Sequence, residues 1–252
     1  MRRLGLTLLL GLVTGCSTTY PIQAGDLDGG THPASSKLVS QEFPNPSEAE
    51  KDQLVVVAAH GYTATTFELQ PAAIYLRSQG MRVSEVLLGA HGTSVQDFEK
   101  STWKTWQAPI VDEYHALQSK GYRNIALLGT STGCTLILEA LSSGKISPAP
   151  KRVALVAPLI EIKNKMAGYA GLLDWFGMKY LDTNPKGDSV GNWYRFRPAS
   201  TITSLVDLTE VMKARLRTGI TLDGTKTLVV QSDQDPTVDP VSAELLKQGL
   251  KS

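Results

Sequence analysis

A serine between two glycines is the strongest chemical signal in this sequence, which reads Gly129-Thr-Ser131-Thr-Gly133. The apolar run 125–128 before it predicts a buried strand, and residues 135–141 after it predict a helix. A tight strand-to-helix turn strains the serine backbone and presents its hydroxyl above the sheet, and flanking glycines leave room for such a turn. The pattern therefore predicts that Ser131 is a nucleophile. The alternative interpretation is a serine in an ordinary strand-to-helix turn.

The residue after this serine could supply a second chemical element. The N–H group of Thr132 would lie at the positive N-terminal end of the predicted helix, where it could stabilise an oxyanion. The remaining chemistry-bearing residues are few: two cysteines, Cys16 and Cys134, and four histidines, which are His32, His60, His91 and His115. Two cysteines are not a disulfide framework, and we expect Cys134 to be a small buried hydrophobe. No histidine or cysteine cluster has ligand spacing, so the sequence predicts neither a metal nor a cofactor.

Composition narrows the class of protein. The chain has 252 residues, of which 42% are hydrophobic and 19% charged, and its formal net charge is +1. This length is enough for one α/β domain with a sizeable core. The near-neutral charge, with no basic run beyond the N-terminus, argues against nucleic acid as the main partner.

The order of the predicted elements indicates the fold class. Apolar runs that predict strands alternate with amphipathic segments that predict helices, from residue 54 to the last predicted helix, which begins near Asp239 and Pro240 and extends to about Leu250. Pro109 is expected near the first turns of one of these helices. This alternation predicts a doubly wound, mostly parallel sheet. The expected strands cover residues 54–59, 81–88, 125–128, 152–157 and 226–231.

One region interrupts the alternation. Residues 159–224 are rich in aromatic and aliphatic side chains, among them Trp175 and Phe176. Such an insertion predicts either a packed helical subdomain or a cap over a pocket.

The first residues predict export. Two arginines precede a short apolar segment, which ends in Val13-Thr-Gly-Cys16. This resembles the lipobox of bacterial lipoprotein signal peptides, and the resemblance implies cleavage before Cys16 and its acylation. The acyl chains would anchor the domain to a membrane of the cell envelope, and Ser17 resembles an outer-membrane destination. An ordinary signal peptide or a short anchor helix is the alternative. The predicted organisation is a signal peptide over 1–15, a tether over 16–53 and a domain over 54–252.

Taken together, the motifs resemble the α/β-hydrolase superfamily, and most of all its bacterial carboxylesterase and monoacylglycerol-lipase-like branch. The resemblance covers residue 54 onward and rests on His60-Gly-Tyr62-Thr, on Gly89-Ala-His-Gly, on the serine turn, and on Gln231-Ser-Asp-Gln-Asp235-Pro-Thr-Val. It implies that Ser131 is the nucleophile and Asp235 the catalytic acid, with Asp233 as the second choice. It also implies that the backbone N–H groups of Tyr62 and Thr132 form the oxyanion hole.

The sequence departs from this family in one respect. In the family the catalytic histidine follows the acid, whereas here no histidine follows Asp235. We expect His60 and His91 to hold loops rather than to act as the base. The absence of a further strand would leave the edge of residues 227–230 bare. We expect a truncated sequence rather than an evolved inactive form.

The leading hypothesis is a membrane-anchored serine hydrolase that cleaves carboxylic esters of apolar acyl chains. Trp175 and Phe176 would bind the acyl chain, and the expected partners are a small ester or lipid and a membrane. A peptidase or thioesterase on the same fold, or a non-catalytic lipoprotein, are the alternatives. The missing histidine favours the non-catalytic alternative, whereas the intact serine turn and acid loop count against it.

Overall fold

The computed structural model describes residues 43–163, 179–183, 186, 192–222 and 224–251. The predicted signal peptide, Cys16, His32, Trp175 and Phe176 lie outside the described residues. Within the described part of the chain, no helix combines the length and the hydropathy needed to cross a membrane.

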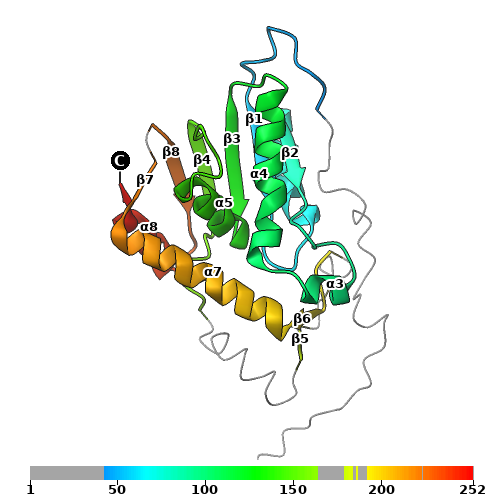
Figure 1. Ribbon diagram of the computed structural model, residues 1–252, viewed down its shortest axis with the longest axis vertical. Coiled ribbons are helices and arrows are strands. Elements are labelled where there is room, and N and C mark those ends of the chain that lie inside the picture. The colour runs from blue at the N-terminus through cyan, green and yellow to red at the C-terminus, as the bar shows by residue number, and fades with distance from the viewer. Residues whose placement is uncertain (1–42, 164–178, 184–185, 187–191, 223, 252) are drawn as a thin grey trace, which may run out of the picture.

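A five-stranded sheet forms the centre of the domain (Figure 1). Its strand order is β2-β1-β3-β4-β8, and all four neighbouring pairs are parallel. This confirms the predicted fold class, a doubly wound α/β sheet. The strands are β1 (Val55–Ala59), β2 (Arg82–Val86), β3 (Ile125–Thr130), β4 (Arg152–Val156) and β8 (Lys226–Val230).

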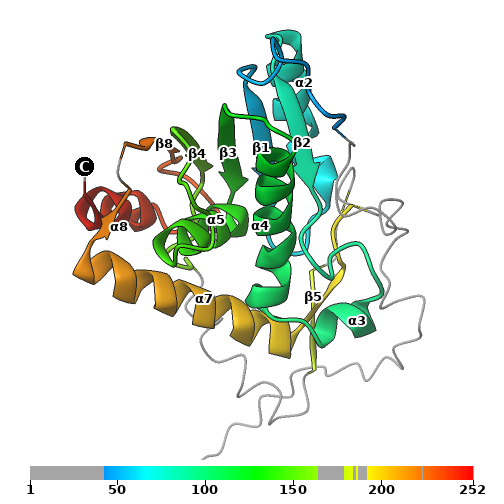
Figure 2. The same cartoon turned by 45° about the horizontal axis from the view of Figure 1, so that its top comes forward.

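Helices cover the two faces of this sheet unequally. The helices α4 and α5 lie on one face, and α7 runs across α5 toward α8 (Figures 1 and 2). On the opposite face α2 packs on the β1 and β2 half (Figure 2). The helical segments are η1 (Thr66–Leu69), α2 (Gln70–Ser78), α3 (Val95–Glu99), α4 (Trp103–Ser119), α5 (Thr132–Ser142), α7 (Ala199–Thr218) and α8 (Val241–Gly249).

Two small pairs of strands complete the fold. The antiparallel pair β5 (Tyr180–Asp182) and β6 (Phe196–Pro198) belongs to the predicted insertion, as does α7. The parallel pair β7 (Ile220–Thr221) and β9 (Leu250–Lys251) closes the C-terminal end. The described part of the insertion is therefore a short sheet followed by one long helix.

The helix α4 contains a proline near its first turns, as predicted. Pro109 is its seventh residue and thus lies beyond the first turn. A proline has no N–H to donate to the carbonyl four residues earlier, here that of Thr105. The backbone of Gly89 packs against this carbonyl, because a Cβ at position 89 would lie 2.1 Å from Thr105 O. The helix continues through the proline, and the hydrogen bond that it lacks is at the place where the turn after β2 approaches the helix.

The end of the predicted tether packs on the domain. Phe43 is buried in the main core and makes an edge-on contact with Tyr122, with ring centroids 6.0 Å apart. The Tyr122 hydroxyl donates to Pro44 O at 3.1 Å, and Arg123 forms a bidentate pair with Asp52. Burial of the Phe43 ring explains why the chain from residue 43 onward is held against the sheet.

Candidate active site

Backbone strain collects at the carboxyl edge of the sheet. Among the residues that the structure describes, four other than glycine have positive φ angles, and they follow β1, β2, β3 and β4 in turn: Thr63 (64°), Ala90 (61°), Ser131 (47°) and Ala157 (47°). Such conformations cost free energy and persist where the surrounding structure holds them, often at functional sites. The edge of the sheet where these strands end is therefore the candidate site.

The turn at Ser131 has the geometry that the sequence predicts. The strand β3 ends at Thr130, α5 begins at Thr132, and Ser131 between them has φ 47° and ψ −115°. Its N–H donates to Val156 O at 2.9 Å, and its carbonyl accepts from Cys134 N–H at 3.1 Å. The first bond holds the strained serine to the end of the neighbouring strand β4, and the second holds it to the first turn of α5.

The two glycines of the motif are required by close backbone contacts. A Cβ at position 129 would lie 2.6 Å from Cys134 N, and one at position 133 would lie 2.4 Å from Ala59 O. Neither distance is sterically possible, so only glycine lets β3, α5 and β1 approach this closely. Cys134 itself is fully buried, as predicted, and burial raises the pKa of its thiol.

Two backbone N–H groups beside the serine have no hydrogen-bond acceptor among the described residues. Thr132 begins α5, so its N–H has no partner within the helix. Among the described residues, no acceptor lies within hydrogen-bonding range of Tyr62 N–H. The neighbouring Gly61 lies so close to the serine that a Cβ there would be 3.2 Å from Ser131 Cβ. The predicted oxyanion donors therefore stand in the two turns that meet at Ser131.

A carboxylate that the sequence analysis missed joins these two turns. Glu68 Oε2 accepts from Gly61 N–H at 2.5 Å and from Thr130 Oγ1 at 2.9 Å. It thereby connects the loop that carries Tyr62 to the residue before Ser131. In the sequence Glu68 looks like an ordinary acidic residue in the first turn of a helix, so no pattern distinguishes it.

Two buried histidines brace the oxyanion loop. His60 Nδ1–H donates to Gly61 O at 2.8 Å, and its Nε2 accepts from Leu88 N–H at 3.0 Å. His91 Nδ1–H donates to its own turn, to Gly89 O at 3.2 Å, and its Nε2 accepts from Thr63 N–H at 3.2 Å. Both ring nitrogens of each histidine form hydrogen bonds with the backbone. This agrees with the prediction that His60 and His91 hold loops.

The third described histidine lies elsewhere. His115 is on α4, and its Nε2–H donates to Lys145 O at 2.7 Å. Within the described residues, no histidine therefore has a ring nitrogen free to accept the proton of the Ser131 hydroxyl. These residues also contain no group of three or more histidine, cysteine, aspartate or glutamate side chains that could hold a metal ion.

A cluster of aromatic rings packs against the loop that carries Tyr62. The Tyr62 hydroxyl lies 2.6 Å from Thr201 Oγ1 on α7, and burial raises the pKa of this phenol. The Tyr194 hydroxyl donates to Thr93 O at 2.7 Å and accepts from Thr93 N–H at 3.0 Å. The cluster consists of the rings of Tyr62, His91, Phe98, Trp106 and Tyr194.

The loop after β8 presents the two candidate acids differently. Asp235 Oδ1 accepts from Thr237 N–H at 2.8 Å and from Val238 N–H at 2.9 Å, so its carboxylate is oriented by the backbone. Asp233 is exposed, and its side chain makes no hydrogen bond to another described residue. Ser131 and Asp235 follow β3 and β8, which flank β4 in the sheet. The geometry favours Asp235 over Asp233 as the ordered acid.

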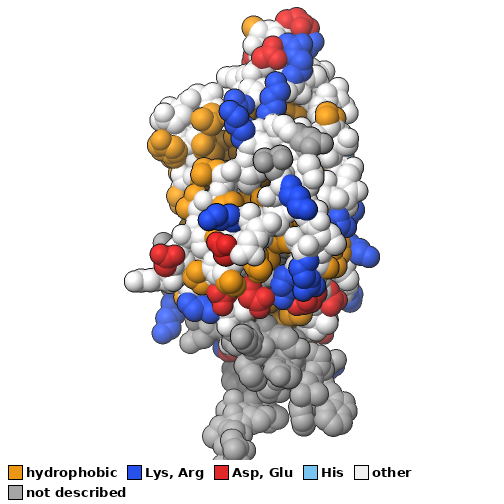
Figure 3. Space-filling view, turned by 90° about the vertical axis from the view of Figure 1, so that its left-hand side faces the viewer, with side chains coloured by type: hydrophobic (Ala, Val, Ile, Leu, Met, Phe, Trp, Pro, Cys, Tyr) orange, Lys and Arg blue, Asp and Glu red, His pale blue; other side chains and the backbone are white. Residues whose placement is uncertain are grey.

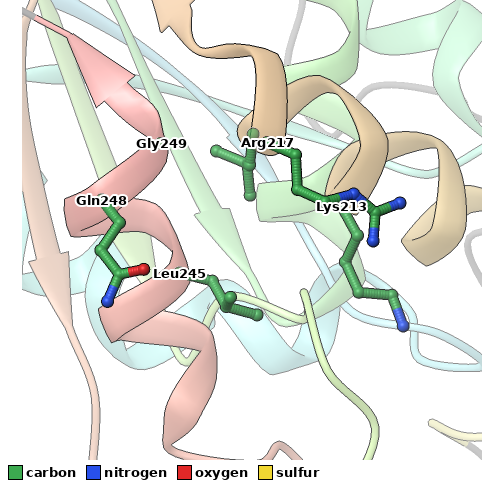
Figure 4. Close-up of a pocket in the computed structure, with 6 residues that line it drawn as sticks. Lys213, Arg217, Leu245, Gln248 and Gly249 are labelled. Atoms are coloured by element: carbon green, nitrogen blue, oxygen red, sulfur yellow. The ribbon is translucent and has the colours of Figure 1, made fainter.

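A pocket of about 410 Å³ lies away from this edge, between α7 and α8 (Figure 4). Its lining combines two cations with apolar side chains, and none of the predicted site residues belongs to it. Lys213 is already paired with Glu161 at 3.0 Å and with Glu210 at 2.5 Å. The lining residues are Lys213, Leu216, Arg217, Leu245, Gln248 and Gly249.

The sheet order, the strained serine turn and the acid loop together define an α/β-hydrolase fold. No family model matches the sequence. Among solved structures, one reported for the metagenome-derived lipolytic enzymes LipS and LipT has the same fold, with a TM-score of 0.66. The match covers 79% of this chain and 80% of that chain, at 20% sequence identity.

Two curated relatives are similar over most of the sequence. A thermostable monoacylglycerol lipase from Bacillus sp. (strain H-257) is 26% identical over 225 residues, 85% of each chain. A carboxylesterase from Bacillus subtilis (strain 168) is 25% identical over 206 residues, which cover 81% of this chain and 80% of that enzyme. The chain is thus similar to serine hydrolases of the carboxylesterase and monoacylglycerol-lipase type.

Proposed function

We propose that this protein is a serine hydrolase that cleaves carboxylic esters of apolar acyl chains. The observation that carries the proposal is Ser131, held at φ 47° where the loop of Tyr62 and the start of α5 meet. Ser131 Oγ gives its proton to a general base, which is not identified among the described residues, and attacks the ester carbonyl, while the N–H groups of Tyr62 and Thr132 stabilise the resulting oxyanion. Collapse of this intermediate releases the alcohol, which takes up the proton, and water then hydrolyses the acyl-enzyme to the free acid. Asp235, which accepts from two backbone N–H groups, is the proposed acid that orients such a base. The ester class of substrate is proposed because the two relatives are a monoacylglycerol lipase and a carboxylesterase.

Because no general base is identified among the described residues, we expect a low rate of ester hydrolysis. All three described histidines use their ring nitrogens in other hydrogen bonds. Loss of the base from a serine triad costs on the order of 10⁴- to 10⁶-fold in kcat, while the oxyanion hole retains some rate over water. We therefore expect the 252-residue chain to hydrolyse a p-nitrophenyl ester weakly.

The test is Ser131-dependent hydrolysis of p-nitrophenyl butyrate by the purified chain, with and without added imidazole. Free imidazole should raise the rate of the wild type and leave Ser131→Ala unchanged. The Asp233→Asn variant is the matched control for Asp235→Asn, because both lie in the same loop. A high rate that His60→Ala or His91→Ala abolishes would show that one of these histidines is the base, contrary to their hydrogen bonding.

A non-catalytic role is the second candidate, because no described histidine is free. It predicts that imidazole has no effect on the wild type and that Ser131→Ala still binds esters with wild-type affinity. A peptidase or thioesterase would instead prefer amide or thioester analogues of the same acyl group.

We further propose that Cys16 is acylated and anchors the protein in the bacterial cell envelope. The support is the sequence alone, a short apolar segment that ends in Val13-Thr-Gly-Cys16. Labelling cells with an alkyne fatty acid should tag the wild type and not Cys16→Ala. Equal label in both would exclude this cysteine as the acceptor.

The acyl site is proposed to include Trp175 and Phe176, on the sequence pattern alone. In an imidazole-supported assay, replacing both with alanine should raise KM for octanoate more than for acetate esters. Equal changes for both esters would mean that the two residues only contribute to packing.

A further inference from the structure

Arg197 on β6 is a half-buried cation for which no described residue supplies an oxygen to accept its hydrogen bonds. Its Nε is buried without a partner, and no hydrogen bond or ion pair joins its guanidinium to any described residue. Burial lowers the pKa of this guanidinium, and no carboxylate offsets the effect. A guanidinium has five N–H donors, and leaving them unpaired away from water is costly.

The other arginines of the domain show how unusual this is. Five of them form ion pairs with a carboxylate at 3.0 Å or less, although most are at least partly exposed. On the same strand pair as Arg197, Arg195 makes a bidentate pair with Asp182. The five paired arginines are Arg77, Arg82, Arg123, Arg195 and Arg215.

The position of Arg197 connects it to the candidate active site. Its guanidinium carbon lies 5.8 Å from the centroid of the Tyr62 ring. The segment that carries Arg197 is attached to the same loop, because Tyr194 N–H donates to Thr63 O at 3.0 Å and Ala64 bridges to Trp193. An anion bound by Arg197 would therefore lie beside the loop that supplies one oxyanion donor.

The neighbour of Arg197 across the strand pair adds an apolar surface. Leu181 is its direct partner in the antiparallel register and is 49% exposed. Directly opposed residues lie on the same face of a sheet, with Cβ atoms about 5 Å apart. A cation and an exposed leucine side by side suit a ligand that combines a negatively charged group with an apolar chain.

We propose that Arg197 binds an anionic group of the substrate, which is an ester that also carries a carboxylate or a phosphate. The guanidinium N–H groups donate to two oxygens of that group, and Leu181 contacts the adjoining hydrocarbon. The ester part of this assignment rests on the proposed function, whereas the anion part does not.

Binding is tested first, in the Ser131→Ala background so that no turnover interferes. Monomethyl glutarate is titrated by calorimetry, and inorganic phosphate is titrated in parallel. Arg197→Met should weaken the binding of the better anion by roughly 10- to 100-fold, as expected for a charged hydrogen-bonded pair. Arg197→Lys should restore part of the loss, and the control Arg195→Met on the same strand pair should change binding less than about twofold. Unchanged affinity in Arg197→Met, equal losses in the two methionine variants, or binding of neither anion would overturn the proposal.

Catalysis gives an independent measurement on the wild-type serine. The ratio of kcat/KM for mono-(4-nitrophenyl) glutarate to that for p-nitrophenyl butyrate should fall in Arg197→Met by the same factor as the affinity, with the neutral ester unaffected. If the wild type hydrolyses neither ester through Ser131, the proposed hydrolase function fails, and the titration alone still decides the role of Arg197. A loss of rate on both esters alike would contradict anion recognition.

Discussion

The two halves of the sheet differ in how firmly they hold their functional residues. In the nucleophile half, formed by β1, β3 and α5, a strained serine and two buried histidines are held by hydrogen bonds to the backbone. In the acid half, formed by β8 and the loop after it, Leu228 is 61% exposed and Val230 is 49% exposed. The chemistry of a hydrolase needs both halves, and the strands of the nucleophile half are far more deeply buried than β8. The predictions below use this difference, from the largest expected effect to the smallest.

A methyl group added to the nucleophile half should be the most damaging change. In Gly133→Ala the new Cβ would overlap Ala59 O, and the backbone on both sides is fixed by β1 and α5. We expect a loss of at least about 3 kcal/mol in the free energy of unfolding, measured with urea.

The matched change in the acid half is Gly224→Ala, before β8, where no atom lies within 4 Å of the position of the added Cβ. There the cost should be only about 1–2 kcal/mol, from the positive φ of 71°. Similar losses at the two sites would contradict the difference between the halves.

Removing a bracing histidine should have the second-largest effect. His60→Ala leaves Leu88 N–H without its acceptor, and His91→Ala does the same to Thr63 N–H. Each variant should lose about 2–4 kcal/mol, because a buried donor becomes unsatisfied and a ring is deleted from the core. His115→Ala, on the partly exposed helix face, is the control and should lose less than about 1 kcal/mol. If His60→Ala kept full stability, the loop would be held by other contacts.

The sequence predicted the nucleophile half better than the acid half for a physical reason. A strained turn demands Gly129 and Gly133, so the backbone geometry leaves a mark in the sequence. The parallel sheet is likewise visible in the apolar runs of its strands. Glu68 and Arg197 were missed, because a side chain that acts through distant contacts has no periodicity or spacing of its own. The helix that follows the acid loop begins at Val241, with Asp239 Oδ1 accepting from Val241 N–H at 3.0 Å, one residue later than predicted.

Deleting one hydroxyl from the oxyanion loop should have a smaller effect. Tyr62→Phe removes the 2.6 Å contact with Thr201 Oγ1 and should cost about 1 kcal/mol at pH 7.

The pH dependence of the free energy of unfolding provides a second test of the Tyr62 hydroxyl. Burial raises the pKa of the Tyr62 phenol in the folded chain, so the full stability contribution is present below the unfolded pKa of about 10 and decreases as the pH rises above it. The phenylalanine variant should lose less stability than the wild type between pH 10 and 11, measured by urea unfolding. A parallel loss in both proteins would assign the alkaline effect to other groups.

A substitution on β8, the edge strand of the acid half, should have the smallest effect on stability. It should have a large effect on solubility. Lys226 N–H donates to Lys151 O and Val230 O accepts from Ala157 N–H, so residues 226, 228 and 230 direct their backbone groups toward β4. In a parallel strand the intervening residues then direct theirs outward, and no described strand pairs with that side. Figure 3 shows hydrophobic side chains gathered on this side of the molecule. Such an edge promotes association between molecules.

Leu228→Lys should change the free energy of unfolding by no more than about 0.5 kcal/mol, because the side chain is already exposed. It should also shift the protein toward the monomer in light scattering, and Ile74→Lys on α2, where the side chain is 64% exposed, is the control for added charge alone. If both lysine variants reduced association equally, net charge rather than the bare strand would govern it.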